Sequence, residues 1–128
     1  MTPRGARVLV ADDDAIVRTL VEQALRRQGH EVLLAVDGAA ALTIASDVSR
    51  PIDLLVTDYT MPGRSGLQLA VDVRALRPDV AIILMSGWRM DQPPTTVPGP
   101  AIEVLEKPFD LTGLARAVER ALRLRPPP

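Results

Sequence analysis

The sequence contains no cysteine, so disulfide scaffolds, thiol nucleophiles and thiolate metal sites are excluded. It contains a single histidine, which excludes metal centres built from several imidazoles. The longest aliphatic run, residues 80–85, is far too short to cross a bilayer, and the first residues lack the apolar run of a secretory signal. The three aromatic residues argue against a stacking platform for single-stranded nucleic acid. We therefore expect a cytoplasmic protein that contacts neither a membrane nor nucleic acid directly.

Charges of one sign are not in excess. The 15 lysine and arginine residues nearly balance the 16 aspartate and glutamate residues, which leaves a net charge of −1. Such a balance does not favour broad electrostatic binding to polyanions. With 128 residues, 47% of them hydrophobic and 24% charged, the chain has the size and composition of one soluble domain. We expect that domain to span residues 1–123, followed by a proline-rich tail at 124–128.

Short apolar segments alternate along the chain with amphipathic ones. Five are typical of buried parallel strands: residues 7–11, 32–36, 52–57, 80–85 and 102–105. Four have helical spacing: residues 16–28, 39–46, 67–76 and 111–122. Gly29 is expected to end the first helix, and Asp37 and Asp110 are candidate N-caps. Strands that alternate with helices predict an α/β fold, a doubly wound parallel sheet with helices on both faces.

The alternation breaks between the fourth and fifth predicted strands. Residues 91–100 contain four prolines. Each proline lacks an amide donor and disfavours the interior of a helix. We expect a loop here, which could include one short helical turn.

Polar side chains follow four of the predicted strands. Residues 12–14 are three aspartates after the first strand, Asp58 follows the third, Ser86 the fourth and Lys107 the fifth. Because the carboxyl ends of parallel strands lie along one edge of a sheet, we expect these groups to converge there.

The chemistry of these groups is that of phosphoryl transfer. Neighbouring carboxylates raise one another's pKa unless a cation lies between them, and Mg2+ prefers such oxygen ligands. A lysine and a serine hydroxyl can bind phosphoryl oxygens, which leaves one carboxylate free to act as nucleophile. The sequence therefore predicts a Mg2+-assisted site where an aspartate accepts a phosphoryl group.

Four motifs make the chain similar to the receiver domains of two-component response regulators, over residues 8–122. They are VLVADDD at 8–14, LLVTDYTMPG at 54–63, ILMSG at 83–87 and KPF at 107–109. The resemblance implies a flavodoxin-like sheet of five strands in the order 2-1-3-4-5. It also implies a signalling protein, not an enzyme, that catalyses only its own phosphorylation and dephosphorylation. Its partner would be a histidine kinase or a histidine phosphotransfer protein, bound by the first helix and the loop after the fifth strand.

The resemblance also implies roles for single residues. Asp58 would be the phosphoacceptor, Ser86 the switch hydroxyl, and Lys107 the contact to the phosphoryl group, with a cis peptide bond before Pro108. The Mg2+ ligands would be Asp12, Asp13, Asp58 and the backbone carbonyl of Thr60.

Two features depart from the usual pattern of that family. Val104 stands where receivers often carry a rotating aromatic residue, and the proline-rich loop shortens or replaces the fourth helix. Both argue against the common dimer, so we expect a monomer or a weak dimer. Residues 85–88 are similar to receivers attached to hybrid sensor histidine kinases, and we expect no DNA-binding segment after Leu122. These features favour a phosphorelay or kinase-regulating role.

Two other functions stay open. The chain could be a degenerate receiver that acts as an interaction module without phosphorylation. It could instead be a haloacid-dehalogenase-type phosphatase, with Asp12 as nucleophile and Asp14 as acid/base, although Asp58 would then have no role. Asp14 could equally be only a helix N-cap. We expect His30 to be exposed in the turn after the first helix, and Trp88 to be a packing plug, a partner contact or a shield for Asp58.

Overall fold

The computed structural model describes residues 5–92 and 94–125. Within these segments the strands are β1 (Arg7–Ala11), β2 (Glu31–Ala35), β3 (Leu54–Asp58), β4 (Ala81–Ser86) and β5 (Ile102–Glu106). The helices are α1 (Ala15–Arg27), α2 (Gly38–Ser46), α3 (Gly66–Leu76) and α4 (Leu111–Arg123). The strands form one parallel sheet in the order β2-β1-β3-β4-β5, so the predicted fold class and strand order are confirmed. Residues 126–128 of the expected tail lie outside the described residues.

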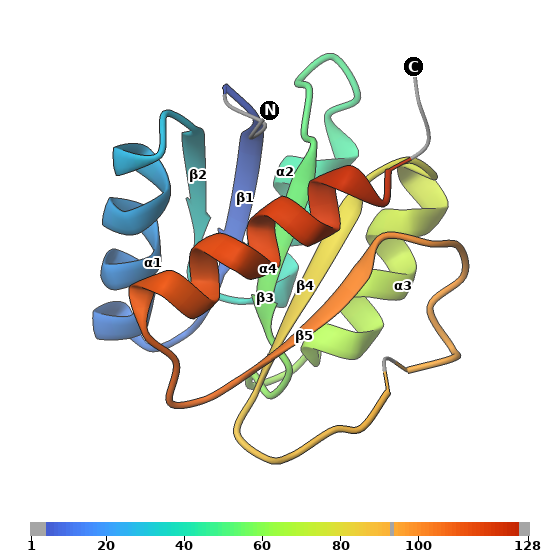
Figure 1. The fold of residues 1–128 in the computed structure, drawn as a ribbon. Helices are drawn as coiled ribbons and strands as arrows, with labels where there is room; N and C mark the ends of the chain where they lie inside the picture. Colours follow the sequence, from blue (N-terminus) through green and yellow to red (C-terminus); the bar gives the residue numbers. More distant parts are fainter. Residues whose placement is uncertain (1–4, 93, 126–128) are drawn as a thin grey trace.

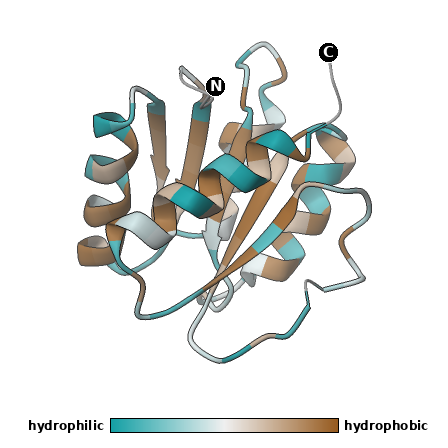
Figure 2. Cartoon of the chain, viewed as in Figure 1, coloured by the Kyte–Doolittle hydropathy of each residue, from teal (hydrophilic) through white to brown (hydrophobic). Residues whose placement is uncertain are grey.

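The sheet is covered on both faces. α1 and α4 lie over one face, and α2 and α3 over the other (Figure 1). The strands are mostly hydrophobic, and β5 includes hydrophilic residues (Figure 2). In β3, for example, Leu54 and Val56 face the core under α1 and α4, whereas Leu55 faces the core under α2 and α3, and all three are fully buried. This two-sided burial explains why the sequence shows continuous apolar runs. None of the helices in the described part of the chain has both the length and the hydrophobicity of a membrane-spanning segment.

Side chains cap the start of each helix in the described segments. The N-cap residues, whose side chains accept backbone amides, are Asp14, Asp37, Ser65 and Asp110. The predicted caps Asp37 and Asp110 are therefore confirmed, and so is the structural role of Asp14. Gly29 comes two residues after the end of α1, directly after the C-cap Gln28. Its φ is +90°, which glycine adopts without strain.

The segment between β4 and β5 is the predicted loop. Its described residues, all but Pro93, form turns and bends without a helical turn. Val97 is 4% exposed and packs into the core under α2 and α3. The buried guanidinium of Arg74, on α3, donates a hydrogen bond from Nη1 to the carbonyl of Pro98. A Cβ at Gly99 would lie 2.4 Å from that nitrogen, so the loop follows α3 closely, and the φ of +87° at this position favours glycine.

The prediction that His30 is exposed is wrong. Its side chain is buried, and its Nδ1 accepts a hydrogen bond from the amide of Ala6 at 3.2 Å. Because Gly29 turns the chain back beside the start of β1, the imidazole takes the place of a sheet partner for that amide. Burial lowers the pKa of His30, and the negative charge of Asp53 opposes the shift.

Candidate functional site

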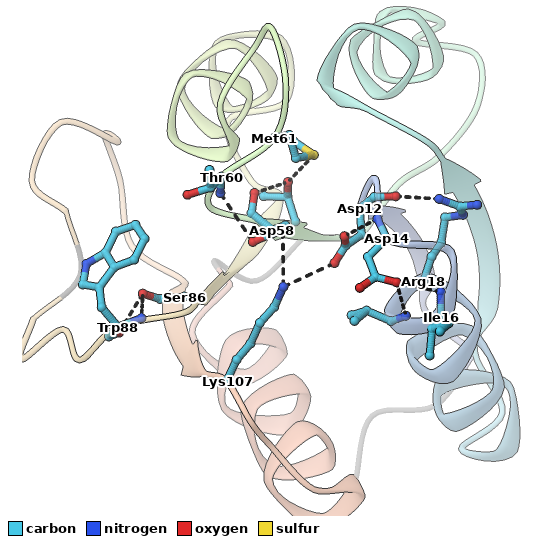
Figure 3. A network of polar contacts seen from close by, with 12 residues as sticks. Asp12, Asp14, Ile16, Arg18, Asp58, Thr60, Met61, Ser86, Trp88 and Lys107 are labelled. Carbon is cyan, nitrogen blue, oxygen red and sulfur yellow. Dashed lines mark hydrogen bonds and ion pairs between the residues drawn. The ribbon is translucent and has the colours of Figure 1, made fainter.

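Three of the predicted site residues meet at the carboxyl edge of the sheet (Figure 3). Asp12 directly follows β1, Asp58 ends β3, and Lys107 directly follows β5. The lysine Nζ lies 3.2 Å from Asp58 Oδ2 and 3.7 Å from Asp12 Oδ2. The structure thus brings these side chains together, as the strand pattern predicts.

The acidic side chains form a compact cluster. Carboxylate oxygens of Asp12, Asp13 and Asp58 all lie within 4.8 Å of one another. Asp12 is fully buried. Its Oδ1 accepts a hydrogen bond from the amide of Asp14 at 2.9 Å, whereas its Oδ2 has no hydrogen-bond partner among the described residues. Burial raises the pKa of Asp12, and the charges of Asp58 and Asp13 add to this effect. The amide of Asp14 and the charge of Lys107 oppose it.

This cluster fits a hard divalent cation. Its donors are all carboxylate oxygens, which Mg2+ prefers. Asp12 Oδ2 is buried without a hydrogen bond, and the lysine 3.7 Å away is shared with Asp58, so a bound cation would lower the cost of burying this charge. The amide of Thr60 donates to Asp58 Oδ1 at 3.4 Å, which places Thr60 beside the cluster. That its carbonyl binds the metal stays a prediction.

Two residues that the sequence pattern did not single out hold the site in shape. Arg18 of α1 donates a hydrogen bond from Nη1 to the carbonyl of Asp12 at 2.7 Å. Gly66 begins α3, and a Cβ there would lie 1.9 Å from the carbonyl oxygen of Asp58. The density of turn residues at 62–66 was a usable signal for Gly66. No local signal marks Arg18, because an arginine on an amphipathic helix is normally solvated.

Ser86 ends β4 at the same edge and is fully buried. Its hydroxyl forms hydrogen bonds with the backbone of Trp88 and not with the acidic cluster (Figure 3). It donates to the Trp88 carbonyl at 2.7 Å and accepts from the Trp88 amide at 3.1 Å. The Trp88 ring packs edge-on against Tyr59, with ring centroids 4.8 Å apart. Trp88 therefore lies beside the residue that follows Asp58, and it is 48% exposed.

A doubly wound sheet with an acidic cluster at its carboxyl edge belongs to the class of α/β proteins that bind their ligands beyond the strand ends. The chain belongs to the response regulator receiver domains, since the model of this family matches residues 8–119. Receiver domains are signalling modules of two-component systems and not true enzymes. The acidic triad of Asp12, Asp13 and Asp58 is typical of their Mg2+ site. The Lys107–Pro108 peptide bond is cis, as the resemblance implies.

Known receivers are similar over nearly the whole chain. The DNA-binding transcriptional regulator NtrC of Azospirillum brasilense is 40% identical over 125 residues, which cover 97% of this chain and 26% of that protein. The receiver domain of the hybrid histidine kinase CckA is 34% identical, with a TM-score of 0.77, over 91% of this chain and 99% of that one. Chemotaxis response regulator CheY4 of Vibrio cholerae is 28% identical, with a TM-score of 0.82, over 92% and 99%.

These similarities bear on the context of the domain. The chain spans about a quarter of the length of the NtrC proteins that it matches. The predicted similarity to receivers of hybrid histidine kinases is confirmed by CckA. The chain is also similar to the receivers of transcriptional regulators.

Proposed function

We propose that residues 1–123 form a phosphoacceptor receiver of two-component or phosphorelay signalling, in which Asp58 takes a phosphoryl group from a phosphohistidine. The observation that carries this proposal is a contrast within the acidic cluster. The side chain of Asp58 is 15% exposed and lies 3.2 Å from Lys107 Nζ, whereas that of Asp12 is completely buried. Because a nucleophile has to be both accessible and next to the ammonium group that binds the phosphoryl oxygens, Asp58 suits the nucleophile, whereas the buried Asp12 suits a ligand of the metal ion.

The transfer exchanges one bond for another. A carboxylate oxygen of Asp58 bonds to phosphorus while the bond from phosphorus to the donor's imidazole nitrogen breaks, and the electron pair stays on that nitrogen. The ammonium group of Lys107 binds a phosphoryl oxygen, and Ser86 donates to another once its hydroxyl leaves Trp88. The residues that would hold Mg2+ are Asp12, Asp13, Asp58 and, by its carbonyl, Thr60. The bound ion supplies neutralisation of the phosphoryl charge.

The phosphoryl donor would be a histidine kinase or a histidine phosphotransfer protein in the cytoplasm. Beside the site, α1 exposes Ile16 at 82% and Leu20 at 44%. A pocket of about 380 Å³ lies between Val17, Leu20 and Phe109 and reaches Lys107. Such an apolar surface suits the helix that carries the donor's histidine, since amphipathic helices bind by placing apolar side chains in grooves. The chain would act as a monomer or weak dimer, without direct contact to nucleic acid.

The phosphatase alternative fits the site poorly. It needs Asp12 as nucleophile, although this carboxylate is fully buried. It also needs Asp14 as acid/base, although Asp14 Oδ1 accepts the amide of Ile16 at 2.9 Å as the N-cap of α1. Two features favour the degenerate receiver: the loop between β4 and β5, where receivers usually have a helix, and Val104. Both remove parts of the usual output face.

Intact-mass analysis after incubation with acetyl phosphate tests the proposal. We expect one phosphoryl addition that requires Mg2+ and is absent from Asp58→Asn. No addition in the presence of saturating Mg2+ would favour the degenerate receiver. Repeated hydrolysis of a generic phosphate ester would favour the phosphatase.

A further inference from the structure

The hydroxyl of Ser86 has already used its only proton. A serine hydroxyl donates one hydrogen bond, and here that bond goes to the Trp88 carbonyl at 2.7 Å. The same oxygen accepts the Trp88 amide at 3.1 Å. Ser86 can therefore donate to a phosphoryl oxygen only after it has broken its bond to Trp88.

The backbone of Ser86 is fixed, so the change has to occur at its side chain and in the turn that follows. Its carbonyl accepts the amide of Lys107 at 2.7 Å, and the preceding Met85 carbonyl accepts the amide of Tyr59 at 2.8 Å. Gly87, next in the chain, has no atom within 4 Å of the position that a Cβ would take. The open space at Gly87 leaves room for the 87–88 peptide to shift.

The ring of Trp88 ties this turn to the strand that carries the phosphoacceptor. Its edge-on contact with Tyr59, at a centroid distance of 4.8 Å, lies next to Asp58 in the chain. Phe109, the remaining aromatic residue of the sequence, is partly buried and packs against the core under α1 and α4. Val104 pairs with Leu84, two residues before Ser86, and is too short to follow a movement of that hydroxyl.

We propose that Trp88 is a positioning residue of this receiver: its backbone holds the Ser86 hydroxyl in the resting direction, its ring is held by Tyr59, and phosphorylation of Asp58 releases both contacts. The inference rests on the proposed phosphorylation of Asp58. Trp88 thereby takes over the sensing role that Val104 is unable to fill. The energy of the Tyr59 contact then opposes activation, because it stabilises the resting conformation alone.

The single tryptophan of the sequence makes the release directly measurable. We would record tryptophan emission and its quenching by acrylamide in the full chain, with acetyl phosphate and Mg2+, while intact mass gives the phosphorylated fraction. In the wild type, emission should shift and quenching should increase in proportion to that fraction. Ser86→Ala, which leaves the ring contact with Tyr59 in place, should keep the resting emission and show no change after phosphorylation, and Ser86→Thr, which keeps the hydroxyl, should restore the response.

The ring contact is tested with beryllofluoride, a phosphoryl analogue, and Mg2+. Tyr59→Leu should increase the apparent affinity for beryllofluoride by about 2- to 10-fold, the range expected for losing one aromatic pair. Tyr59→Phe keeps the ring and is the matched control, with wild-type affinity expected.

The possible outcomes separate the inference from the function on which it rests. Phosphorylated wild type with unchanged emission would overturn the role of Trp88 and leave the phosphoacceptor intact. An equal emission change in phosphorylated Ser86→Ala would also overturn it, because the phosphoryl group would then act on the ring directly. Absence of any phosphorylation would instead refute the proposed function.

Discussion

The buried carboxylate of Asp12 should destabilise the metal-free protein, so Asp12→Asn should stabilise it. The asparagine keeps an oxygen for the Asp14 amide, which Asp12 Oδ1 accepts at 2.9 Å. It replaces Oδ2, which accepts no hydrogen bond among the described residues, with an uncharged group. The change therefore removes a negative charge at nearly constant shape.

The magnitude follows from the charges around Asp12. At an effective dielectric constant of about 20, two carboxylate oxygens no more than 4.8 Å apart repel by at least roughly 3 kcal/mol, and a lysine at 3.7 Å returns roughly 4 kcal/mol. Asp12 has two acidic neighbours and one cation, and solvent screens the exposed Asp13. With the burial cost included, we expect the free energy of unfolding to rise by about 1–2 kcal/mol, or a Tm higher by about 3–8 °C.

The pH dependence gives the same effect a second signature. Because the folded-state pKa of Asp12 is raised above 3.8, the native protein binds this proton more tightly than the unfolded chain does. The cost is absent below the ordinary pKa and complete above the raised one. The free energy of unfolding of the wild type in EDTA should therefore fall as pH rises through that window. The Asp12→Asn protein should not show this fall.

Thermal unfolding followed by circular dichroism, in EDTA and in Mg2+, measures these effects. Mg2+ should stabilise the wild type and leave Asp12→Asn almost unchanged. Asp14→Asn is the matched control, since it removes a charge from the same turn while asparagine still caps α1, and it should stay within about 0.5 kcal/mol. A less stable Asp12→Asn protein in EDTA, or an equal response to Mg2+ in both proteins, would refute the reasoning.

Three further predictions concern other parts of the molecule. Ile16→Glu should slow phosphotransfer from a phosphohistidine donor by about 10-fold or more but leave phosphorylation by acetyl phosphate unchanged; parallel losses would contradict a docking role. Gly99→Ala should lower stability to urea by about 1–3 kcal/mol, because a φ of +87° is strained for alanine and its Cβ meets the Arg74 guanidinium, whereas Gly87→Ala should be nearly neutral. Because the pKa of His30 is lowered in the folded protein, stability should fall as pH drops below about 6.5. Urea titrations from pH 7.5 to 5.5 should show this fall in the wild type and not in His30→Asn. The same fall in both proteins would show that another group causes it.

The sheet could be predicted because its strands are buried on both faces. β3 and β4 have no solvent face, so their apolar runs are unbroken and easily read. The convergence of Asp12, Asp58 and Lys107 then follows, since parallel strands place their carboxyl ends on one edge. The bounds of β1 match the prediction and those of the other strands differ from it by at most two residues, because hydrogen bonding and not hydropathy decides where a strand ends.

Contacts between distant segments could not be predicted in the same way. Arg74 and Pro98 are 24 residues apart, as are Ala6 and His30, and neither partner is marked by a local pattern. A polar residue after a helix is usually solvated. The burial of His30 depends on the direction that the chain takes after the turn at Gly29. The turn at Ser86 is local, but its tie to Tyr59 depends on strand pairing.

The distance across the sheet and the two carboxylates at its end together account for a lysine as the cation of the site. β4 separates β5 from β3, so a residue on β5 has to bridge two strand spacings, about 10 Å, to reach Asp58. Lys107 crosses this distance with a flexible aliphatic stem and reaches Asp58 at 3.2 Å and Asp12 at 3.7 Å with one compact charge. An arginine would spread its charge over a planar fork suited to one carboxylate at a time. Because Asp12 and Asp58 share one ammonium group, any group that neutralises Asp58 should strengthen the ion pair between Lys107 and Asp12.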